Sequence, residues 1–140
     1  MPANASALVG RAVQIGVVAE RTELSIRTLR HYDEVGLVTP SARSTGGFRL
    51  YTEQDIARLH TIRRMKPMGF TLEEMRHLLD CLAVLADPAA GPENRDSASA
   101  YVVECHIRAK ESCRALEQQL AYAVEFRNLL ADHRSPRTPG

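Results

Sequence analysis

The chain has 140 residues, of which 44% are hydrophobic and 25% charged, a composition typical of one compact domain with an appendage. Its formal net charge is only +1, but residues 1–70 carry 10 Lys and Arg against 6 Asp and Glu, whereas residues 71–140 carry 8 against 11. No apolar run reaches the roughly 20 residues of a membrane helix, and three cysteines without close spacing argue against a disulfide framework, so we expect a cytoplasmic protein with no membrane partner.

The front part of the chain predicts a small domain over residues 13–84. Residues 1–12 are small and polar, and we expect them to form a flexible tail. The domain begins with a short strand at residues 13–15 and a first helix at residues 16–21. A short polar turn then leads into a second helix, so that the two helices form a helix-turn-helix.

The second predicted helix covers residues 26–35. Ser25 is a natural N-cap for it, and Gly36 supplies the left-handed residue that ends it. Its apolar residues, Ile26 and Leu29 among them, fall on one face. The remaining surface is basic and free for a polyanion, and it carries Arg27, Thr28, Arg30 and His31. A helix of this kind fits the major groove of double-stranded DNA.

A basic hairpin follows the second helix. Residues 42–51 read as two short strands, and Gly46 and Gly47 tolerate the positive φ angles of the tight turn between them. Arg43 and Arg49 flank the tip of this hairpin. The combination predicts a winged helix-turn-helix, in which the helix lies in the major groove and the wing lies along phosphates or the minor groove.

Two more helices complete the predicted domain. Thr52 is placed to cap the first of these helices, and the apolar stripe of that helix points inward. Two basic residues near its end, Arg63 and Lys66, are candidates for a second wing. A capping box at Thr71 begins the other helix, which runs to about residue 83 and closes the core with its leucines.

The back part of the chain predicts a linker, a long helix and a tail. Residues 85–96 contain two prolines and a glycine and read as a linker, whereas residues 97–131 contain neither. In that second range, apolar residues alternate at spacings of four and three, which is typical of a coiled coil. Residues 132–140 are expected to be disordered.

A single chain of this size cannot cover the apolar stripe of so long a helix, so we expect a homodimer with an antiparallel coiled coil. The contacts come from Val102, Ala109, Cys113, Leu116, Leu120, Ala123 and Leu130. A two-fold axis between Arg114 and Ala115 sets the register, and three of the four resulting layers join a larger side chain to a smaller one. These layers pair Cys113 with Leu116, Ala109 with Leu120, His106 with Ala123, and Val102 with Arg127 of the partner chain.

Three motifs occur together in one order: TLRHYDEVGL, GGFRLY and MGFTLEEM. With their surroundings they cover about half of the chain, and in this order they resemble the MerR family of bacterial transcription regulators. The resemblance implies a mostly α-helical dimer on a near-palindromic promoter site. It also implies activation by bending and untwisting promoter DNA so that RNA polymerase can engage it.

The resemblance also implies roles for individual residues. Arg30 and Tyr32 would contact phosphates, although Tyr32 could instead belong mostly to the core. Arg27 and Thr28 would lie toward base edges, while the wing would be held on the DNA backbone by Arg43, Phe48 and Arg49. His31 stands where many relatives carry tyrosine or phenylalanine.

The signal that such a regulator answers is left open. Metal-sensing relatives carry cysteines at the start of the long helix and after it, where this chain reads DSASA and RNLLADHRSPRTPG. We expect no cofactor and no metal, with His77, Cys81 and Cys105 as the remaining candidates for such a site. The alternative function is an effector-free architectural or developmental DNA-binding protein. No catalytic motif occurs, so we do not expect an enzyme.

Overall fold

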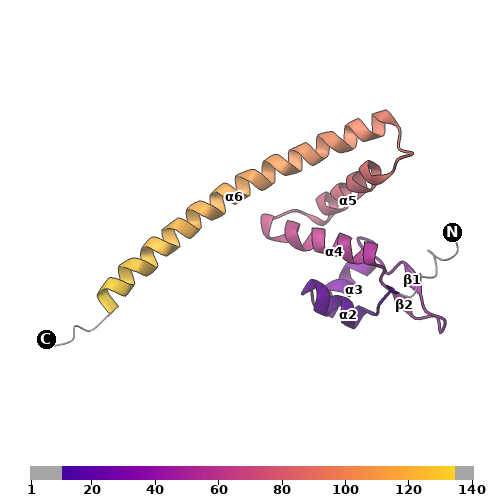
Figure 1. The fold of residues 1–140 in the computed structure, drawn as a ribbon, viewed down its shortest axis with the longest axis horizontal. Helices are drawn as coiled ribbons and strands as arrows, with labels where there is room; N and C mark the ends of the chain where they lie inside the picture. Colours follow the sequence, from indigo (N-terminus) through magenta and orange to yellow (C-terminus); the bar gives the residue numbers. More distant parts are fainter. Residues whose placement is uncertain (1–10, 135–140) are drawn as a thin grey trace.

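A computed structural model describes residues 11–134 of the chain. Figure 1 shows a head, built from short helices and a hairpin, and a long helix, α6, that leads away from it. Residues 1–10 and 135–140, most of the two predicted tails, lie outside the described residues.

The head begins with the predicted helix-turn-helix. Its helices are α2 (Ile15–Thr22) and α3 (Ile26–Glu34). Ser25 caps α3 as predicted, because its hydroxyl accepts a hydrogen bond from the Thr28 amide at 3.0 Å. Gly36 follows the helix with a φ of 71°, the left-handed conformation expected there.

The wing is a two-stranded antiparallel hairpin of β1 (Ala42–Arg43) and β2 (Arg49–Leu50). Gly47 in its turn has a φ of 84°, as the glycine pair predicted. The strand expected at residues 13–15 is reduced to one bridge between Val13 and Tyr51, because α2 already begins at Ile15.

Three further elements complete the head: α4 (Glu53–Met65), the short 3-10 helix η1 (Lys66–Met68) and α5 (Leu72–Ala86). Both predicted caps form. Thr52 and Thr71 each accept a hydrogen bond from the amide three residues on, and the acid at that position bonds back to the cap amide. η1 and the turn after it, which contains Gly69, are called the second wing below.

The core of the head joins all of these elements. Its most completely buried large side chains are Val18, Leu29, Tyr51, Ile56, Leu59 and Ile62. One carboxylate is also buried, that of Asp55, and it accepts hydrogen bonds from the Thr52 amide at 2.9 Å and from the Ser41 amide and hydroxyl at 3.0 and 2.7 Å. Asp55 therefore fixes the chain before the wing onto the start of α4.

The linker is shorter and the last helix longer than predicted. α5 runs to Ala86 and α6 spans Pro92–Arg134, so the linker comprises residues 87–91 rather than 85–96, and the helix exceeds the predicted 97–131 at both ends. A proline fits the first turn of a helix because its missing N–H would have no partner there. The first hydrogen bond of α6 runs from the Arg95 amide to the Gly91 carbonyl at 3.0 Å.

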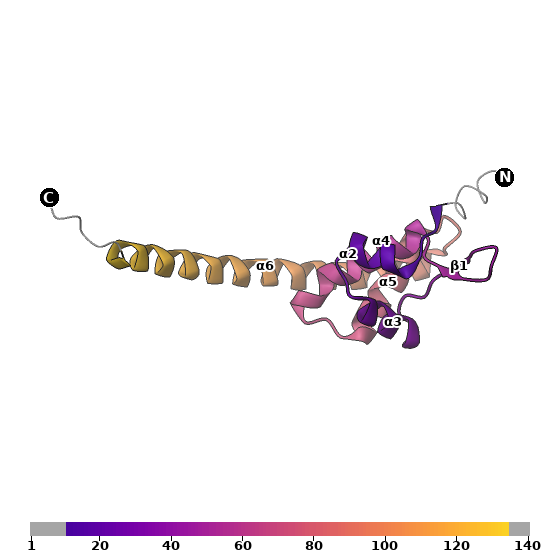
Figure 2. The ribbon, with the colours of Figure 1, turned by 90° about the horizontal axis from the view of Figure 1, so that it is seen from below.

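Helix α6 packs on the head with its first half alone. Tyr101, Val102 and Cys105 lie against the core, alongside α5. Figure 2 shows the second half running clear of the head. Several large apolar side chains are exposed there: Leu116, Leu120, Tyr122, Phe126, Leu129 and Leu130. Among residues 11–134, no helix is both long and apolar enough to cross a membrane.

Candidate nucleic-acid interface

The outer face of α3 carries the predicted basic residues. Leu29 and Tyr32 anchor the helix in the core, and Arg27, Arg30 and His31 are exposed on the remaining surface. Thr28 is half-buried, and its hydroxyl lies 2.8 Å from the Ser25 hydroxyl. The capping interaction thus orients the first turn of α3, where the residues expected to meet base edges lie.

A broad open hollow of about 960 Å³ lies between α3 and the second wing. Its basic lining consists of Arg27, Arg30, His31 and Lys66. Lys66 comes from η1, so the structure brings this second-wing candidate to the same concave face as the basic residues of α3. Ile26, Phe70, Leu72 and Met75 supply apolar lining, and Glu34 supplies a carboxylate. A concave basic surface attracts a polyanion such as DNA.

Tyr32 has both of the characters that the sequence left open. Its side chain is buried, with 3% of its surface exposed, and it also contributes to the lining of the hollow. Burial raises the pKa of its phenol, so the hydroxyl stays protonated at neutral pH. The ring belongs to the core, and the hydroxyl keeps its capacity to donate a hydrogen bond.

Arg49 forms an ion pair within the head. Its guanidinium donates to both carboxylate oxygens of Asp33, at 2.7 and 2.8 Å, which fastens the wing to the end of α3. Arg43 donates to the Gly47 carbonyl at 3.3 Å inside the hairpin. Phe48, at the tip, is 68% exposed. The structure therefore leaves the tip of the wing accessible and gives Arg49 a positioning contact.

Arg63 also lies apart from the hollow. Its Nη1 donates to the carboxylate of Glu23 at 2.9 Å and to the Thr22 carbonyl at 3.0 Å. Glu23 holds the turn of the helix-turn-helix with a φ of 59°, an uncommon value for a residue other than glycine. Arg63 thereby ties this turn to α4.

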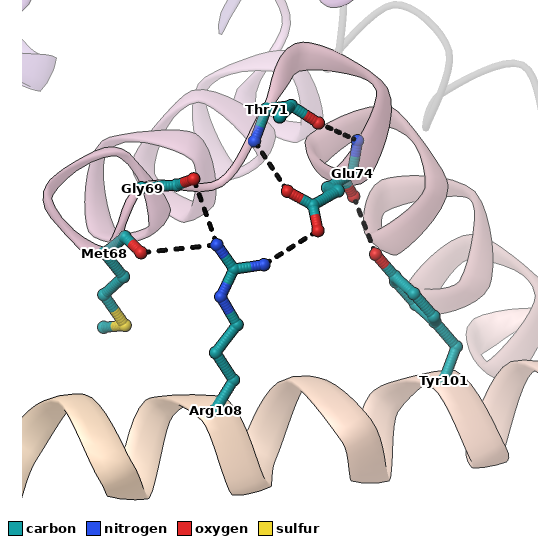
Figure 3. Close-up of polar contacts among 6 residues, drawn as sticks. All are labelled: Met68, Gly69, Thr71, Glu74, Tyr101 and Arg108. Carbon is teal, nitrogen blue, oxygen red and sulfur yellow. Dashed lines mark hydrogen bonds and ion pairs between the residues drawn. The ribbon is translucent and has the colours of Figure 1, made fainter.

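The sequence did not predict the contacts between α6 and the second wing. Figure 3 shows the guanidinium of Arg108 between the carboxylate of Glu74 and two carbonyls of the second wing. Its Nη1 donates to Glu74 at 2.8 Å, and its Nη2 donates to the carbonyls of Gly69 and Met68 at 3.0 and 3.4 Å. It also stacks on the Phe70 ring, 3.8 Å from the ring centre. Arg108 lies outside the predicted seam of the coiled coil, and nothing in the sequence around it indicates that it binds the second wing.

Glu74 serves two elements at once. One oxygen accepts the Thr71 amide that begins α5, and the other accepts Arg108. The hydrogen bond from Thr71, followed by that from Arg108, holds the pKa of this carboxyl below its ordinary value. The carboxylate is therefore charged under all but strongly acidic conditions.

The cysteine and histidine candidates lie between α5 and α6. His77 Nε2 is 4.0 Å from Cys81 Sγ, and the ring of His77 packs edge-on against that of Tyr101. Burial raises the pKa of the Cys81 and Cys105 thiols, which disfavours the thiolate that binds metals. Within the part of the chain that the structure describes, no three His, Cys, Asp or Glu side chains gather as metal ligands.

Comparison with known proteins agrees with this geometry. Residues 13–82 match the family described as MerR HTH family regulatory protein. The regulator CueR of Salmonella typhi is 34% identical over 111 residues, which are 79% of each chain. The crystal structure of PbrR691 from Ralstonia metallidurans CH34, a complex with lead(II), shares 31% identity and a TM-score of 0.50, over 91% of this chain and 92% of that one.

A further relative matches the head. The nodulation protein NolA of Bradyrhizobium sp. (strain NC92) is 40% identical over 77 residues, which are 55% of this chain and 32% of NolA. The chain thus spans about a third of the length of the NolA proteins that it matches. CueR is a transcriptional regulator by name, and the prediction that the chain is not an enzyme is confirmed. With half of its residues inside the family match and 79% of its length aligned with CueR, the chain belongs to the MerR family of DNA-binding transcription regulators.

Proposed function

We propose that the chain binds a near-palindromic promoter site as a homodimer and regulates transcription there by reading DNA sequence. The observation that carries this proposal is the hollow between α3 and the second wing, because four basic side chains from two elements line one concave face. α3 would enter the major groove, and the second wing would follow the phosphates. The place of action is the bacterial cytoplasm.

The contacts follow from where each side chain lies. Arg27 and Thr28 lie on the first turn of α3, where they would meet base edges. The DNA backbone would be bound from two places. Around the hollow, the contacts come from the hydroxyl of Tyr32 and from the basic side chains of Arg30, His31 and Lys66. At the wing, they come from Arg43 and Phe48. Arg49 and Arg63 act through the elements that they fix, the wing and the helix-turn-helix turn.

The homodimer rests on the second half of α6. Leu116 and Leu120 stand on the predicted seam, and more than half of each side chain is exposed in the single chain. An apolar stripe of this kind is stable in water when a second helix covers it. Two heads joined in this way would occupy two half-sites of one operator, and each head would raise the effective concentration of the other.

Selection of binding sites from a random duplex library tests this proposal. The expected consensus has two inverted half-sites, and Arg27→Ala should relax the preference at one symmetric pair of positions. A library that yields a single half-site, or no enriched sequence, would contradict it. Arg114→Ala, an exposed arginine on α6 far from the hollow, is the matched control and should leave the consensus unchanged.

The proposed mode of regulation is distortion of the promoter. A dimer that untwists an overlong spacer would allow RNA polymerase to contact both promoter elements, at an energetic cost that depends on the DNA sequence. Transcription in vitro from promoters of graded spacer length tests this. Shortening the spacer to its ordinary length should make transcription independent of the protein, whereas equal dependence at every length would rule out the mechanism.

A further inference from the structure

An apolar groove lies between the head and the first half of α6. Its volume is about 260 Å³, and its lining includes Met65, Met68, Leu78 and Leu82 of the head, with Val102 and Cys105 of α6. An apolar cavity of about 150 Å³ is large enough to bind benzene. The groove, which Phe70 of the same chain also lines, therefore has room for one further aromatic ring.

A second apolar surface lies at the other end of α6, where none of residues 11–134 covers it. Phe126 is 60% exposed, and Tyr122 and Leu129 beside it are also exposed. Phe126 follows Cys105 by three heptads, so both stand on the same side of the coiled-coil seam. Near Cys105 this side of α6 packs on the head of its own chain, whereas the second half of the helix extends beyond the head (Figure 2).

We propose that Phe126 of each chain fills the groove of the other chain, so that each head is held by two α6 helices. The inference deepens the homodimer proposed above and rests on it. In the proposed antiparallel register, Ala109 meets the partner's Leu120 inside the seam. Cys105 and the partner's Phe126 do not belong to the seam itself but face each other along one edge of it. The aromatic side chain is thereby brought to the one wall of the groove that α6 itself provides.

The charges on the other side of the seam fit the same register. Lys110 and Glu117 are both exposed, and the register places Lys110 opposite the partner's Glu117, twice in each dimer. Sliding the helices by one heptad in either direction would bring Lys110 against the partner's Lys110, or Glu117 against the partner's Glu117. Like charges in direct opposition are unfavourable, so the neighbouring registers are disfavoured.

The contact links the dimer to the DNA-binding surface. Met65, the last residue of α4, and Met68, the last residue of η1, lie on the wall of the groove, and η1 carries Lys66 into the basic hollow. An aromatic ring packed against these methionines would fix the base of the second wing from the partner's side. Arg108 holds the same segment from its own side through the carbonyls of Met68 and Gly69.

A disulfide test locates the contact. The background chain carries Cys81→Ala and Cys113→Ser, so that Cys105 is the remaining thiol, and Phe126→Cys is added to it. Diamide oxidation at mildly alkaline pH should convert the chain to a reducible covalent dimer, in which peptide mapping finds Cys105 joined to position 126. Glu125→Cys is the matched control, because that position is at the same height but turned about 100° around the helix, and it should stay unlinked.

A second pair separates failure of this inference from failure of the dimer. Ala109→Cys with Leu120→Cys, in a chain whose three native cysteines are replaced by alanine, reports the seam without using Cys105 or Phe126; Ala109 lines the edge of the groove, but Leu120 is its seam partner in the proposed register. If this pair links and Phe126→Cys does not, the groove contact is wrong while the dimer stands. The groove contact is equally wrong if a crystal structure of the dimer shows a small apolar molecule in the groove in place of Phe126. If neither pair links and the protein sediments as a monomer, the homodimer itself is wrong.

Discussion

Arg108 on α6 donates a hydrogen bond to Glu74 on α5 at 2.8 Å, and the same guanidinium binds the Gly69 carbonyl in the second wing (Figure 3). One side chain of the long helix thus holds both the start of α5 and a turn beside the basic hollow. Because this guanidinium joins α6 to the head, it would influence how the two heads of the proposed dimer meet one operator.

Replacing Arg108 should weaken DNA binding without touching the DNA surface. Arg108→Ala should lower both the melting temperature and the affinity for the operator, because the second wing loses its attachment to α6. A double-mutant cycle with Glu74→Gln should show a non-additive effect, since the two side chains share one interaction. Fully additive effects would mean that the contact is not formed in solution. Arg114→Ala is the control for loss of a charge on α6.

The stability contributed by Glu74 should depend on pH. Its pKa in the folded chain lies below the ordinary value of 4.5, so its stabilising effect is complete above that pH and is lost as the pH falls through the folded-state pKa. Urea unfolding of the native chain and of Glu74→Gln should be measured from neutral pH to about pH 3. The difference between their free energies of unfolding should shrink toward zero at the acid end. A gap of constant size would refute the assignment, and Glu73→Gln provides the comparison at the neighbouring position.

Arginines on α3 should differ in what they contribute. Arg30→Ala should weaken binding to specific and random duplexes alike and reduce the slope of log affinity against log salt by about one. Arg27→Ala should reduce the free energy of binding to the operator by about 1–3 kcal/mol, because a contact to a base edge is lost. The loss on random DNA should be much smaller. Fluorescence anisotropy across a salt series measures both. Equal losses on the two kinds of DNA for Arg27→Ala would exclude a role in base reading.

The features of this fold that could be predicted are those encoded within a few residues. Ser25, Thr52 and Thr71 can be identified as caps because each accepts a hydrogen bond from the amide three residues on. Both partners of such a bond lie in one short stretch of sequence. The glycines that end α3 and close the wing can be identified for the same reason. The prediction for Pro92 was wrong because a proline suits both a linker and the first turn of a helix, and only tertiary packing decides between them.

The side-chain contacts of the site could not be predicted in the same way. Arg49 and Arg63 were expected on DNA from their charge and place in the chain, yet their partners in the structure, Asp33 and Glu23, are 16 and 40 positions away. No local pattern reports such a pairing. Lys66 was expected near the DNA and does line the hollow, because the short η1 turns it toward α3.

The seam of α6 should be sensitive to charge at Leu120. Leu120→Glu should convert the dimer to a monomer in analytical ultracentrifugation and lower operator affinity about a hundredfold, because the two heads would no longer be linked. Gln118→Glu adds the same charge on a face of the helix turned away from the seam and should leave both properties unchanged. Persistence of the dimer with Leu120→Glu would show that the seam lies elsewhere on α6.

Asp55 should be essential to the stability of the head. Asp55→Ala leaves the Thr52 amide and both Ser41 donors without their acceptor, so we expect a loss of about 3 kcal/mol in the free energy of unfolding. Chemical denaturation followed by circular dichroism measures this. The exposed neighbour Gln54→Ala should change stability by less than about 0.5 kcal/mol, and an equally small loss for Asp55→Ala would contradict the proposed role.

The stoichiometry and affinity of the complex with a selected operator test the central claim most directly. Sedimentation of the protein with a duplex that carries both half-sites should show two chains on one DNA. Its affinity should exceed that for a single half-site by about two orders of magnitude. One chain per duplex, or equal affinity for the full site and the half-site, would contradict the proposal of two linked heads on one promoter site.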